Sequence, residues 1–210
     1  ILNITNMEKT VYCEKRKITQ ERILFSIPGF NDDFAGYGVD AFIIKNGEKI
    51  CRASTAFDVV SSPAKNIRYG FLSDFSKEGK DNDDVETLRK YHINMVQYYD
   101  WSYRHDNFIS YNKDYTDMMG RKLNIDIIKE KIKNCHKYGI KSIAYGPIYA
   151  ASKEFYENHS EWGFYSSSGK PLVFINVFYI MNISKECPWH EHIINEYVKA
   201  LKEMGFDGIH

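Results

Sequence analysis

The sequence predicts an α/β fold in which an array of parallel strands and helices follows a smaller all-β segment. Three observations lead to this expectation. Over residues 1–62, apolar residues alternate in short runs, as in antiparallel strands. After Pro63, short apolar runs alternate with amphipathic segments of helical period. Two long insertions, residues 107–124 and 150–184, follow expected strand ends, where a (β/α)8 barrel places its active-site loops. We therefore expect the first half of a (β/α)8 TIM barrel, preceded by part of an immunoglobulin-like β-sandwich.

The first expected domain is the C-terminal part of a β-sandwich over residues 1–62. Residues 22–27 and 39–44 have strand-like patterns, and the Asn46-Gly47 pair leads into a further expected strand over 49–53. Asn-Gly is the preferred pair of a two-residue hairpin turn. A complete sandwich of this type has about seven strands, so we expect its amino-terminal part to lie outside the chain.

The second expected domain, residues 63–210, shows a regular succession of strands and helices. Short turns between such elements are typical of a parallel βα array. If the array is half a barrel, its first and last strands are open edges of the sheet. The expected strands are 67–71, 93–99, 141–149 and 206–209, and the expected helices are 83–92, 125–138 and 188–204.

Composition narrows the possible functions. The chain has 28 basic and 28 acidic residues and a formal net charge of zero, which argues against a nucleic-acid partner. It has no run of eighteen apolar residues, so no membrane span is expected. Aromatic residues make up 15% of the chain and include 16 tyrosines, each of which offers a polyhydroxyl ligand both ring surface and a hydroxyl.

The cysteines and histidines show no metal-binding pattern. The four cysteines lie far apart and include no C-x-x-C pair, so neither a common zinc motif nor a disulfide framework is predicted. Only His190 and His192 are close, and their i, i+2 spacing does not suit one face of a helix. We expect no metal and no cofactor.

The stretch 94–106, NMVQYYDWSYRHD, carries the clearest functional signal, because an apolar strand start runs directly into aromatic and charged residues. Aromatic rings can stack on the apolar face of a sugar, while carboxylates and guanidinium groups bind its hydroxyls. Carboxylates beside Arg104 are expected to bind hydroxyls in their charged form. A surface loop that happens to be aromatic is the alternative. The expected substrate-binding residues are Tyr99, Asp100, Trp101, Tyr103, Arg104, His105 and Asp106, with Tyr145 and Tyr149 on the next strand.

Several of these residues also have structural interpretations. Trp101 could pack inside the barrel, although a tryptophan beside an aspartate at a strand end favours sugar stacking. Arg104 could connect loops through Asp100 or Asp106. His105 could contact a hydroxyl or support another residue by a hydrogen bond. One of the two tyrosines on the next strand is expected to face the barrel lumen and the other the loop.

Six motifs in order resemble glycoside hydrolase family 66, the dextranases and cycloisomaltooligosaccharide glucanotransferases. The resemblance runs from about residue 23 to residue 210. It implies a sandwich followed by a (β/α)8 barrel that acts on α-1,6-linked glucan with retention of configuration. The motifs are 68–75 (RYGFLSDF), 99–106 (YDWSYRHD), 120–121 (GR), 144–145 (AY) with 148–152 (IYAAS), 159–162 (HSEW) and 206–210 (FDGIH).

The resemblance also implies where the reaction takes place. Retaining hydrolysis needs two carboxyl groups about 5 Å apart. In the family, the nucleophile stands a few residues beyond the motif matched by 207–210, and the acid/base follows a later strand. Both are expected beyond His210, so no catalytic residue is expected in this chain, and the 210 residues alone are expected to be inactive. His210, at the end of the last motif, is counted with the substrate-binding residues, whereas Asp207 is expected to help begin its strand.

The predicted function is that of a fragment of a retaining, endo-acting hydrolase that cleaves α-1,6 linkages of dextran. A cycloisomaltooligosaccharide-forming glucanotransferase and a non-catalytic carbohydrate-binding protein are the alternatives. An aldolase-like barrel would need a strand-borne lysine or a phosphate-binding glycine loop, and neither pattern is found. Expected partners are α-1,6-glucan or isomaltooligosaccharides and the remainder of the barrel. Because dextran is too large to enter a cell, we expect an extracellular or cell-surface protein.

Overall fold

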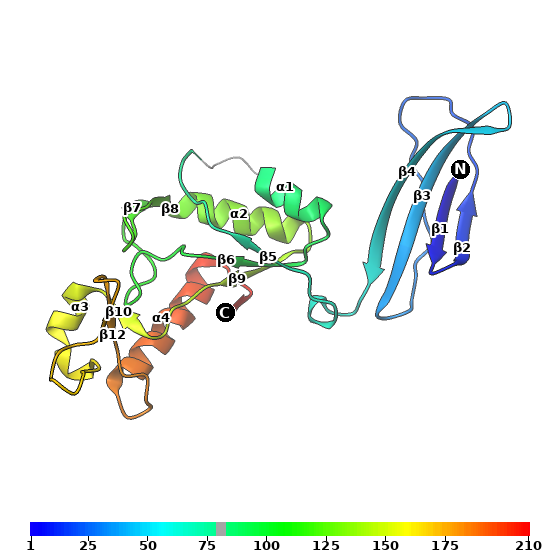
Figure 1. Ribbon diagram of the computed structural model, residues 1–210. Helices are drawn as coiled ribbons and strands as arrows, with labels where there is room; N and C mark the ends of the chain where they lie inside the picture. Colours follow the sequence, from blue (N-terminus) through cyan, green and yellow to red (C-terminus); the bar gives the residue numbers. More distant parts are fainter. Residues whose placement is uncertain (79–82) are drawn as a thin grey trace. The chain divides into compact units, whose positions relative to one another are not determined.

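The computed structural model describes residues 1–78 and 83–210 and divides them into two compact units, Ile1–Ile67 and Arg68–His210 (Figure 1). The boundary follows Ile67 rather than Ser62, because the short helix η1 (Pro63–Lys65), which Ser62 caps, belongs to the first unit. Pairing is antiparallel in the sheet of the first unit and parallel in the main sheet of the second. The expected α/β class is thereby confirmed.

The first unit is a four-stranded antiparallel sheet in the order β2-β1-β3-β4. The predicted Asn-Gly hairpin joins β3 to β4 and is confirmed, with φ angles of 52° at Asn46 and 85° at Gly47. Tyr37 packs between Phe30 and Phe57, with ring centroids 4.4 and 5.2 Å away. The strands are β1 (Leu2–Asn6), β2 (Lys9–Glu14), β3 (Ala35–Lys45) and β4 (Glu48–Val59).

The expected strand over residues 22–27 is not formed, and residues 15–34 contain no strand. A side chain uses one of the backbone acceptors of this segment, since Arg16 Nη1 donates to the Leu24 carbonyl at 2.6 Å. The Arg16 guanidinium also lies over the Phe25 ring. Pro28, which follows this segment, has no backbone N–H and so cannot donate a hydrogen bond to a neighbouring strand. The hairpin of β1 and β2, which the alternation did not predict, fills the place beside β3. Residues 1–67 thus form one sheet and lack the second layer of a sandwich.

The second unit contains the predicted parallel sheet, in the order β13-β9-β6-β5, so the two predicted edge strands are confirmed. Strand β9 ends at Ala144 rather than Tyr149, because Pro147 cannot donate and Gly146 lies against Tyr197. In chain order the elements are β5 (Tyr69–Leu72), α1 (Asp83–Lys90), β6 (Met95–Tyr98), α2 (Ile125–Lys137), β9 (Lys141–Ala144), α4 (Pro188–Met204) and β13 (Gly208–Ile209).

Local sequence explains where the longer helices begin and end. The Asn124 side chain accepts from the Ile127 amide at the start of α2. Helix α2 ends before Gly139, and α4 begins with Pro188 and ends before Gly205, both glycines having positive φ. The helices pack on the face of the sheet to which Val96 and Tyr98 of β6 point, and both side chains are fully buried.

The two insertions follow the carboxyl ends of β6 and β9, as expected. The first contains the hairpin of β7 (Asp114–Thr116) and β8 (Lys122–Asn124). The second contains α3 (Lys153–Asn158), η2 (Ser160–Trp162) and a small antiparallel sheet of β10 (Ala150–Ala151), β12 (Phe178–Ile180) and β11 (Val173–Phe174). Among the residues described, no helix has the length and apolar character needed to cross a bilayer.

Candidate functional site

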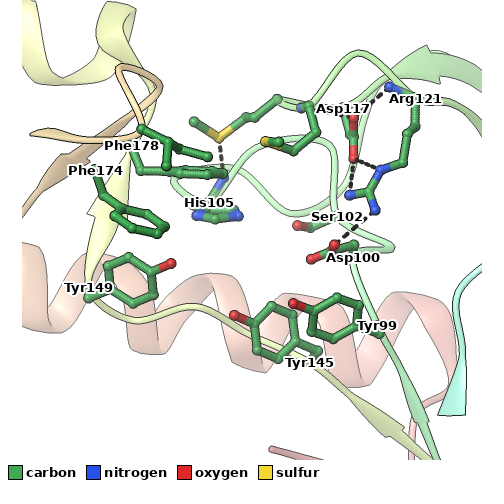
Figure 2. A pocket seen from close by; sticks show the side chains of 13 residues that line it. Tyr99, Asp100, Ser102, His105, Asp117, Arg121, Tyr145, Tyr149, Phe174 and Phe178 are labelled. Atoms are coloured by element: carbon green, nitrogen blue, oxygen red, sulfur yellow. Dashed lines mark hydrogen bonds and ion pairs between the residues drawn. The ribbon is translucent and has the colours of Figure 1, made fainter.

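A pocket of about 190 Å³ lies at the carboxyl ends of β6 and β9 (Figure 2). Its volume is below the roughly 300–1,000 Å³ of sites that enclose a whole drug-sized ligand, so it suits a small unit such as one sugar ring. Four segments line it. Residues 99–105 follow β6, 117–121 belong to the first insertion, 145–149 follow β9, and 174–178 belong to the second insertion.

Three tyrosines form one wall of the pocket. The rings of Tyr99 and Tyr145 lie 4.8 Å apart, and Tyr149 stands beside them (Figure 2). Burial raises the pKa of Tyr145 to about 12 and also raises that of Tyr149, so both hydroxyls are protonated at neutral pH. None of the three hydroxyls has a hydrogen-bond partner within residues 1–78 and 83–210. Tyr145 and Tyr149 both line this pocket, and the expectation that one faces the barrel lumen and the other the loop stays a prediction.

Asp100 turns the chain at the end of β6. Its φ of 54° lies in the left-handed region, which aspartate tolerates better than most residues. Its Oδ2 accepts a hydrogen bond from Arg121 Nη1 at 2.8 Å, and 21% of its side chain remains exposed. Its Oδ1 has no partner in the described part of the chain. Asp100 therefore presents one unused carboxylate oxygen to the pocket.

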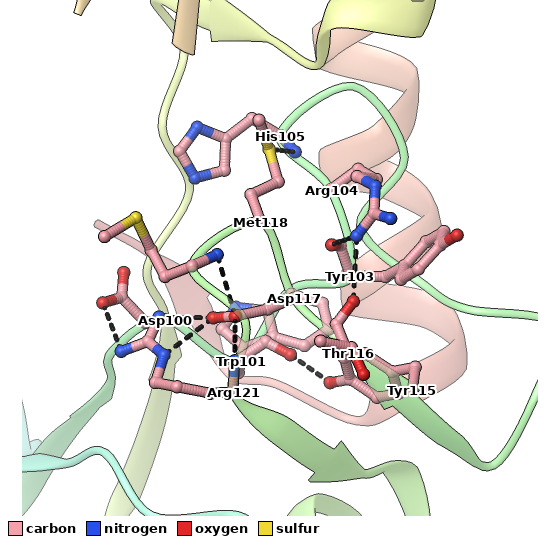
Figure 3. A network of polar contacts seen from close by, with 11 residues as sticks. Asp100, Trp101, Tyr103, Arg104, His105, Tyr115, Thr116, Asp117, Met118 and Arg121 are labelled. Atoms are coloured by element: carbon pink, nitrogen blue, oxygen red, sulfur yellow. Dashed lines mark hydrogen bonds and ion pairs between the residues drawn. The ribbon is translucent and has the colours of Figure 1, made fainter. Parts of the chain in front are cut away.

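Arg121 binds two carboxylates at once (Figure 3). Besides Asp100, it binds Asp117, whose Oδ2 accepts from Arg121 Nε at 2.8 Å. Asp117 Oδ1 also accepts from the backbone amides of Met119 and Arg121, at 3.0 and 2.8 Å, and the side chain is only 4% exposed. These contacts give Asp117 a structural role in the loop that carries Arg121. The partner of Asp100 is thus Arg121 and not Arg104, because the first insertion brings Arg121 back to the tip of β6.

His105 forms part of the pocket opposite the tyrosines. Its ring stacks on Phe178 with a centroid distance of 4.5 Å and an interplanar angle of 9°. Burial lowers the pKa of His105 to about 4, so the imidazole is neutral at neutral pH. Its Nδ1 is buried and has no hydrogen-bond partner among the described residues. The expected supporting hydrogen bond is therefore absent at Nδ1, and contact with a hydroxyl stays a prediction.

Trp101 lies in the core and not in the mouth of the pocket. It is 1% exposed, its Nε1 donates to the Tyr145 carbonyl at 2.9 Å, and its ring packs against Phe206 at 4.9 Å. This placement differs from the expected sugar stacking. The chain turns at Asp100, and burial of the large ring among apolar neighbours stabilises the turn. Trp101 thus holds the base of the pocket through its hydrogen bond to the segment that follows β9.

Tyr103, Arg104 and Asp106 line a different depression, outside the pocket. Arg104 lies 4.0 Å over the Tyr103 ring and donates to the carbonyls of Tyr103 and Thr116, both at 2.9 Å. Arg104 therefore connects loops, as one expectation held, but through carbonyls rather than aspartates. Asp106 Oδ1 accepts from the Ser152 amide at 2.5 Å and so binds the second insertion. These contacts indicate a bracing role for all three.

The two residues singled out at the end of the chain do not line the pocket. His210 Nδ1 is 3.2 Å from Gln97 Nε2. Asp207 accepts from Lys141 Nζ at 2.7 Å and from the Ser142 amide at 2.8 Å, and its Oδ2 lies 2.7 Å from His136 Nε2. Burial acts to raise the pKa of Asp207, but these hydrogen bonds outweigh it and lower the pKa below its usual value. Asp207 joins the starts of β9 and β13, as expected.

Sequence reasoning missed several residues that line the pocket, and four of them, Arg121, Phe174, Ile175 and Phe178, have large side chains that shape it. Arg121 belongs to the motif 120–121, and this motif was the sequence signal that could have identified it. The other three belong to the second insertion, beyond the motifs that end at residue 152 and span 159–162. The His159 and Trp162 rings stack on each other at 4.2 Å and do not line the pocket. In the described residues, no group of three or more His, Cys, Asp or Glu side chains could hold a metal ion.

Comparisons with known proteins agree on one family. The sequence profile of glycosyl hydrolase family 66 matches residues 2–210. Two cycloisomaltooligosaccharide glucanotransferases of Niallia circulans are 28% and 27% identical to this chain; the matches cover 100% and 90% of this chain but only 23% and 21% of the enzymes. The chain therefore spans less than a quarter of the length of these relatives.

Solved structures extend this result. The crystal structure of a cycloisomaltooligosaccharide glucanotransferase of Paenibacillus sp., complexed with cycloisomaltoheptaose, matches with a TM-score of 0.86 and 29% identity. That match covers 100% of this chain and 32% of the other. A maltogenic α-amylase of Thermotoga neapolitana matches 70% of this chain, and 39% of its own, at a TM-score of 0.50 and 16% identity, which is a likeness of fold alone.

Proposed function

Because the chain belongs to glycosyl hydrolase family 66, we propose that it takes part in the recognition of α-1,6-linked glucan and that the pocket between β6 and β9 holds one glucose residue of this substrate. The observation that carries the proposal is the unused hydrogen-bonding capacity of the pocket. Three tyrosine hydroxyls and one oxygen of Asp100 face it without a partner in the described residues, next to apolar rings. A sugar ring has the complementary surface, with hydroxyls at its rim and C–H groups on its faces.

The substrate class is supported by the relatives. The Paenibacillus structure contains cycloisomaltoheptaose, and that enzyme aligns with the whole of this chain. An isomaltooligosaccharide is an α-1,6-linked glucan, so the ligand of that enzyme and the substrate proposed here have the same linkage. We take the expected partners, α-1,6-glucan and isomaltooligosaccharides, as the proposed ligands of the pocket.

The proposed architecture is half of a (β/α)8 barrel for residues 68–210 and part of a β-sandwich for residues 1–67. Support for the barrel comes from the parallel order β13-β9-β6-β5, which leaves β5 and β13 as edges able to pair with further strands. The position of the pocket agrees with this architecture, because barrel enzymes place their sites at the carboxyl ends of the strands.

The proposed reaction is retaining cleavage of α-1,6-glucosidic linkages, which needs a nucleophilic and an acid/base carboxyl group. We assign neither role to Asp100, Asp117 or Asp207. Asp117 already has a hydrogen bond at both oxygens, and Asp207 lies at the opposite end of the sheet. Asp100 is held by Arg121 and is assigned to hydroxyl binding. The isolated 210 residues should therefore release no product from dextran.

Hydrolysis and cyclising transfer share the same first step and differ in what attacks the glycosyl-enzyme intermediate. In hydrolysis water attacks, whereas in cyclisation the far end of the same glucan chain attacks. The dextranase function predicted from the sequence remains a proposal. The names of both Niallia circulans relatives favour the cyclising alternative. We also propose an extracellular or cell-surface location, because a polymeric glucan cannot cross a membrane unaided.

Product analysis tests this proposal. The protein as its gene encodes it would be incubated with dextran, and with amylose as an α-1,4-linked control, before chromatographic separation of the products. Linear isomaltooligosaccharides with new reducing ends indicate hydrolysis, and cyclic isomaltooligosaccharides indicate transfer. Binding of isomaltotriose without turnover would support the non-catalytic alternative. If the protein neither binds nor cleaves α-1,6-glucan, the proposal is contradicted.

A further inference from the structure

The turn between β11 and β12 has a sequence that does not fit its backbone. The Val177 amide donates to the Phe174 carbonyl at 3.1 Å, and the two residues between them have φ angles of 45° at Ile175 and 60° at Asn176. A turn with two positive φ angles favours Asn-Gly, as at Asn46-Gly47 of the first unit. A β-branched residue with positive φ is a genuine outlier, because its branched Cβ crowds the backbone.

Burial in the core does not account for this choice of residue. Ile175 is 50% exposed, and its neighbour Phe174 is 54% exposed. A half-exposed isoleucine gains only part of the burial free energy that would offset an unfavourable φ. An asparagine at this position would relieve the turn and lose little packing. The apolar, strained side chain thus has no explanation in the stability of the hairpin itself.

The position of the turn suggests a different explanation. Ile175 and Phe174 line the pocket, and Phe178 on the next strand is buried and stacked on His105, which fixes the hairpin against the pocket. Figure 2 shows Phe174 and Phe178 on one side and Tyr99 and Asp100 on the other. The pocket therefore has a polar wall with unused hydrogen-bonding groups and an apolar wall supplied by the hairpin.

We propose that Ile175 is a specificity-determining residue that contacts the carbon face of an α-1,6-linked glucose residue held in the pocket. The inference rests on the proposed function of the pocket and assigns its specificity for the α-1,6 linkage to the apolar wall. Each α-1,6 linkage passes through the C6 methylene, an apolar group that an α-1,4 linkage does not place between the rings. An aliphatic side chain at a fixed position can contact that methylene, whereas an asparagine would leave it uncovered.

The substitution Ile175→Asn separates binding from stability, because the two are expected to change in opposite directions. In the protein as its gene encodes it, relief of the strained φ is expected to raise the Tm by roughly 2–4 °C. The affinity for isomaltotriose, measured by calorimetry, is expected to fall about 5–10-fold. Its ratio to the affinity for maltotriose is expected to fall as well.

Two further variants show which property of Ile175 matters. Ile175→Val keeps the branched shape and most of the apolar surface, so it should bind almost as well as the wild type. Ile175→Thr has the shape of valine with a hydroxyl in place of one methyl, so its weaker binding would report the apolar contact without a change in backbone preference. Met7→Asn is the matched control, since Met7 has φ of 51° in a hairpin turn of the first unit and is 91% exposed. It should leave affinity unchanged.

The outcomes distinguish this inference from the proposed function. If the wild-type protein binds isomaltotriose and Ile175→Asn binds it equally well with the same linkage preference, the role of Ile175 is overturned and the function stands. If Ile175→Thr binds as well as Ile175→Val, the apolar contact is likewise overturned. If the wild-type protein does not bind isomaltotriose, both the proposed function and this inference fall.

Discussion

The two ends of the parallel sheet hold aspartates with opposite surroundings. At the amino end, Asp207 accepts hydrogen bonds from Lys141 and the Ser142 amide and pairs with His136. At the carboxyl end, Asp100 accepts one charged hydrogen bond from Arg121 and keeps an oxygen facing a pocket lined by tyrosines. A carboxylate surrounded by donors of its own chain has little capacity left for a ligand, whereas a carboxylate fixed through one oxygen can bind a hydroxyl with the other.

The histidines of the two ends differ in the same way. His136 at the amino end is paired with a carboxylate, whereas His105 at the carboxyl end is buried without a partner for Nδ1 in the described residues. The amino end is thus built for stability, and the carboxyl end contains polar groups that are incompletely satisfied. Such groups are stable only if the surrounding core holds them in place, and Trp101 and Phe178 provide that support here.

As the pH falls, protonation at the carboxyl end should therefore lower the free energy of unfolding before protonation at the amino end does. This is the largest effect that we expect. The pKa of His105 is about 4 in the folded protein against 6.5 for an unperturbed histidine. Between these values the unfolded chain binds more protons than the folded protein, so the free energy of unfolding falls as the pH falls. At 1.36 kcal/mol per pKa unit, the difference between the folded and unperturbed pKa of His105 corresponds to a loss of roughly 3 kcal/mol in the free energy of unfolding.

The variant His105→Phe isolates this contribution, since it retains an aromatic ring beside Phe178 and cannot be protonated. Denaturant unfolding at several pH values between 4 and 7 should show a shallower pH dependence than in the wild type. Asp207 has a lowered pKa, so its contribution is present above the pKa of the unfolded chain and is lost only as the pH falls through the folded value. An equal pH dependence in wild type and variant would show that His105 is not held neutral by burial.

Asp100→Asn should weaken isomaltotriose binding by about 10–100-fold, because hydrogen bonds to charged groups contribute about 1.5–3 kcal/mol. The substitution keeps the shape of the side chain and the left-handed backbone, which asparagine also tolerates. The Tm should change little. Calorimetric titration with isomaltotriose measures the affinity, and an affinity equal to that of the wild type would remove Asp100 from the binding site.

Asp207→Asn should change stability and leave binding unaltered, in contrast to Asp100→Asn. We expect a loss of about 1 kcal/mol in the free energy of unfolding and an unchanged affinity for isomaltotriose. It is the matched control for Asp100→Asn, because the same chemical change is made at the other end of the same sheet. Denaturant unfolding and the same calorimetric titration measure the two quantities. Weakened binding without loss of stability would mean that Asp207 acts in the site after all.

Much of the fold could be predicted because local signals agree with the final structure. Helix α4 was predicted at its observed bounds, since Pro188 and Gly205 mark its ends. The Asn46-Gly47 hairpin and the edge strands of the parallel sheet were predicted for similar reasons. The strand expected over 22–27 failed because alternation describes a possible sheet face but does not supply a partner strand.

The site was predicted less completely because its contacts join distant parts of the chain. Asp100 was identified from its own neighbours, but its partner Arg121 arrives through the first insertion. A tryptophan beside an aspartate has the same local sequence whether its ring faces a ligand or the core, and in Trp101 it faces the core. Ile175 gives no local signal at all, since only the backbone of its turn shows that the residue is unusual.

The central claim is that the pocket at the carboxyl ends of β6 and β9 binds an α-1,6-linked glucose residue. A crystal structure of the protein with isomaltotriose tests it most directly. The account predicts a sugar ring in this pocket, with a hydroxyl hydrogen-bonded to the free oxygen of Asp100 and further hydroxyls on Tyr99, Tyr145 or Tyr149. A trisaccharide bound elsewhere on the protein, with this pocket holding only water, would contradict the claim.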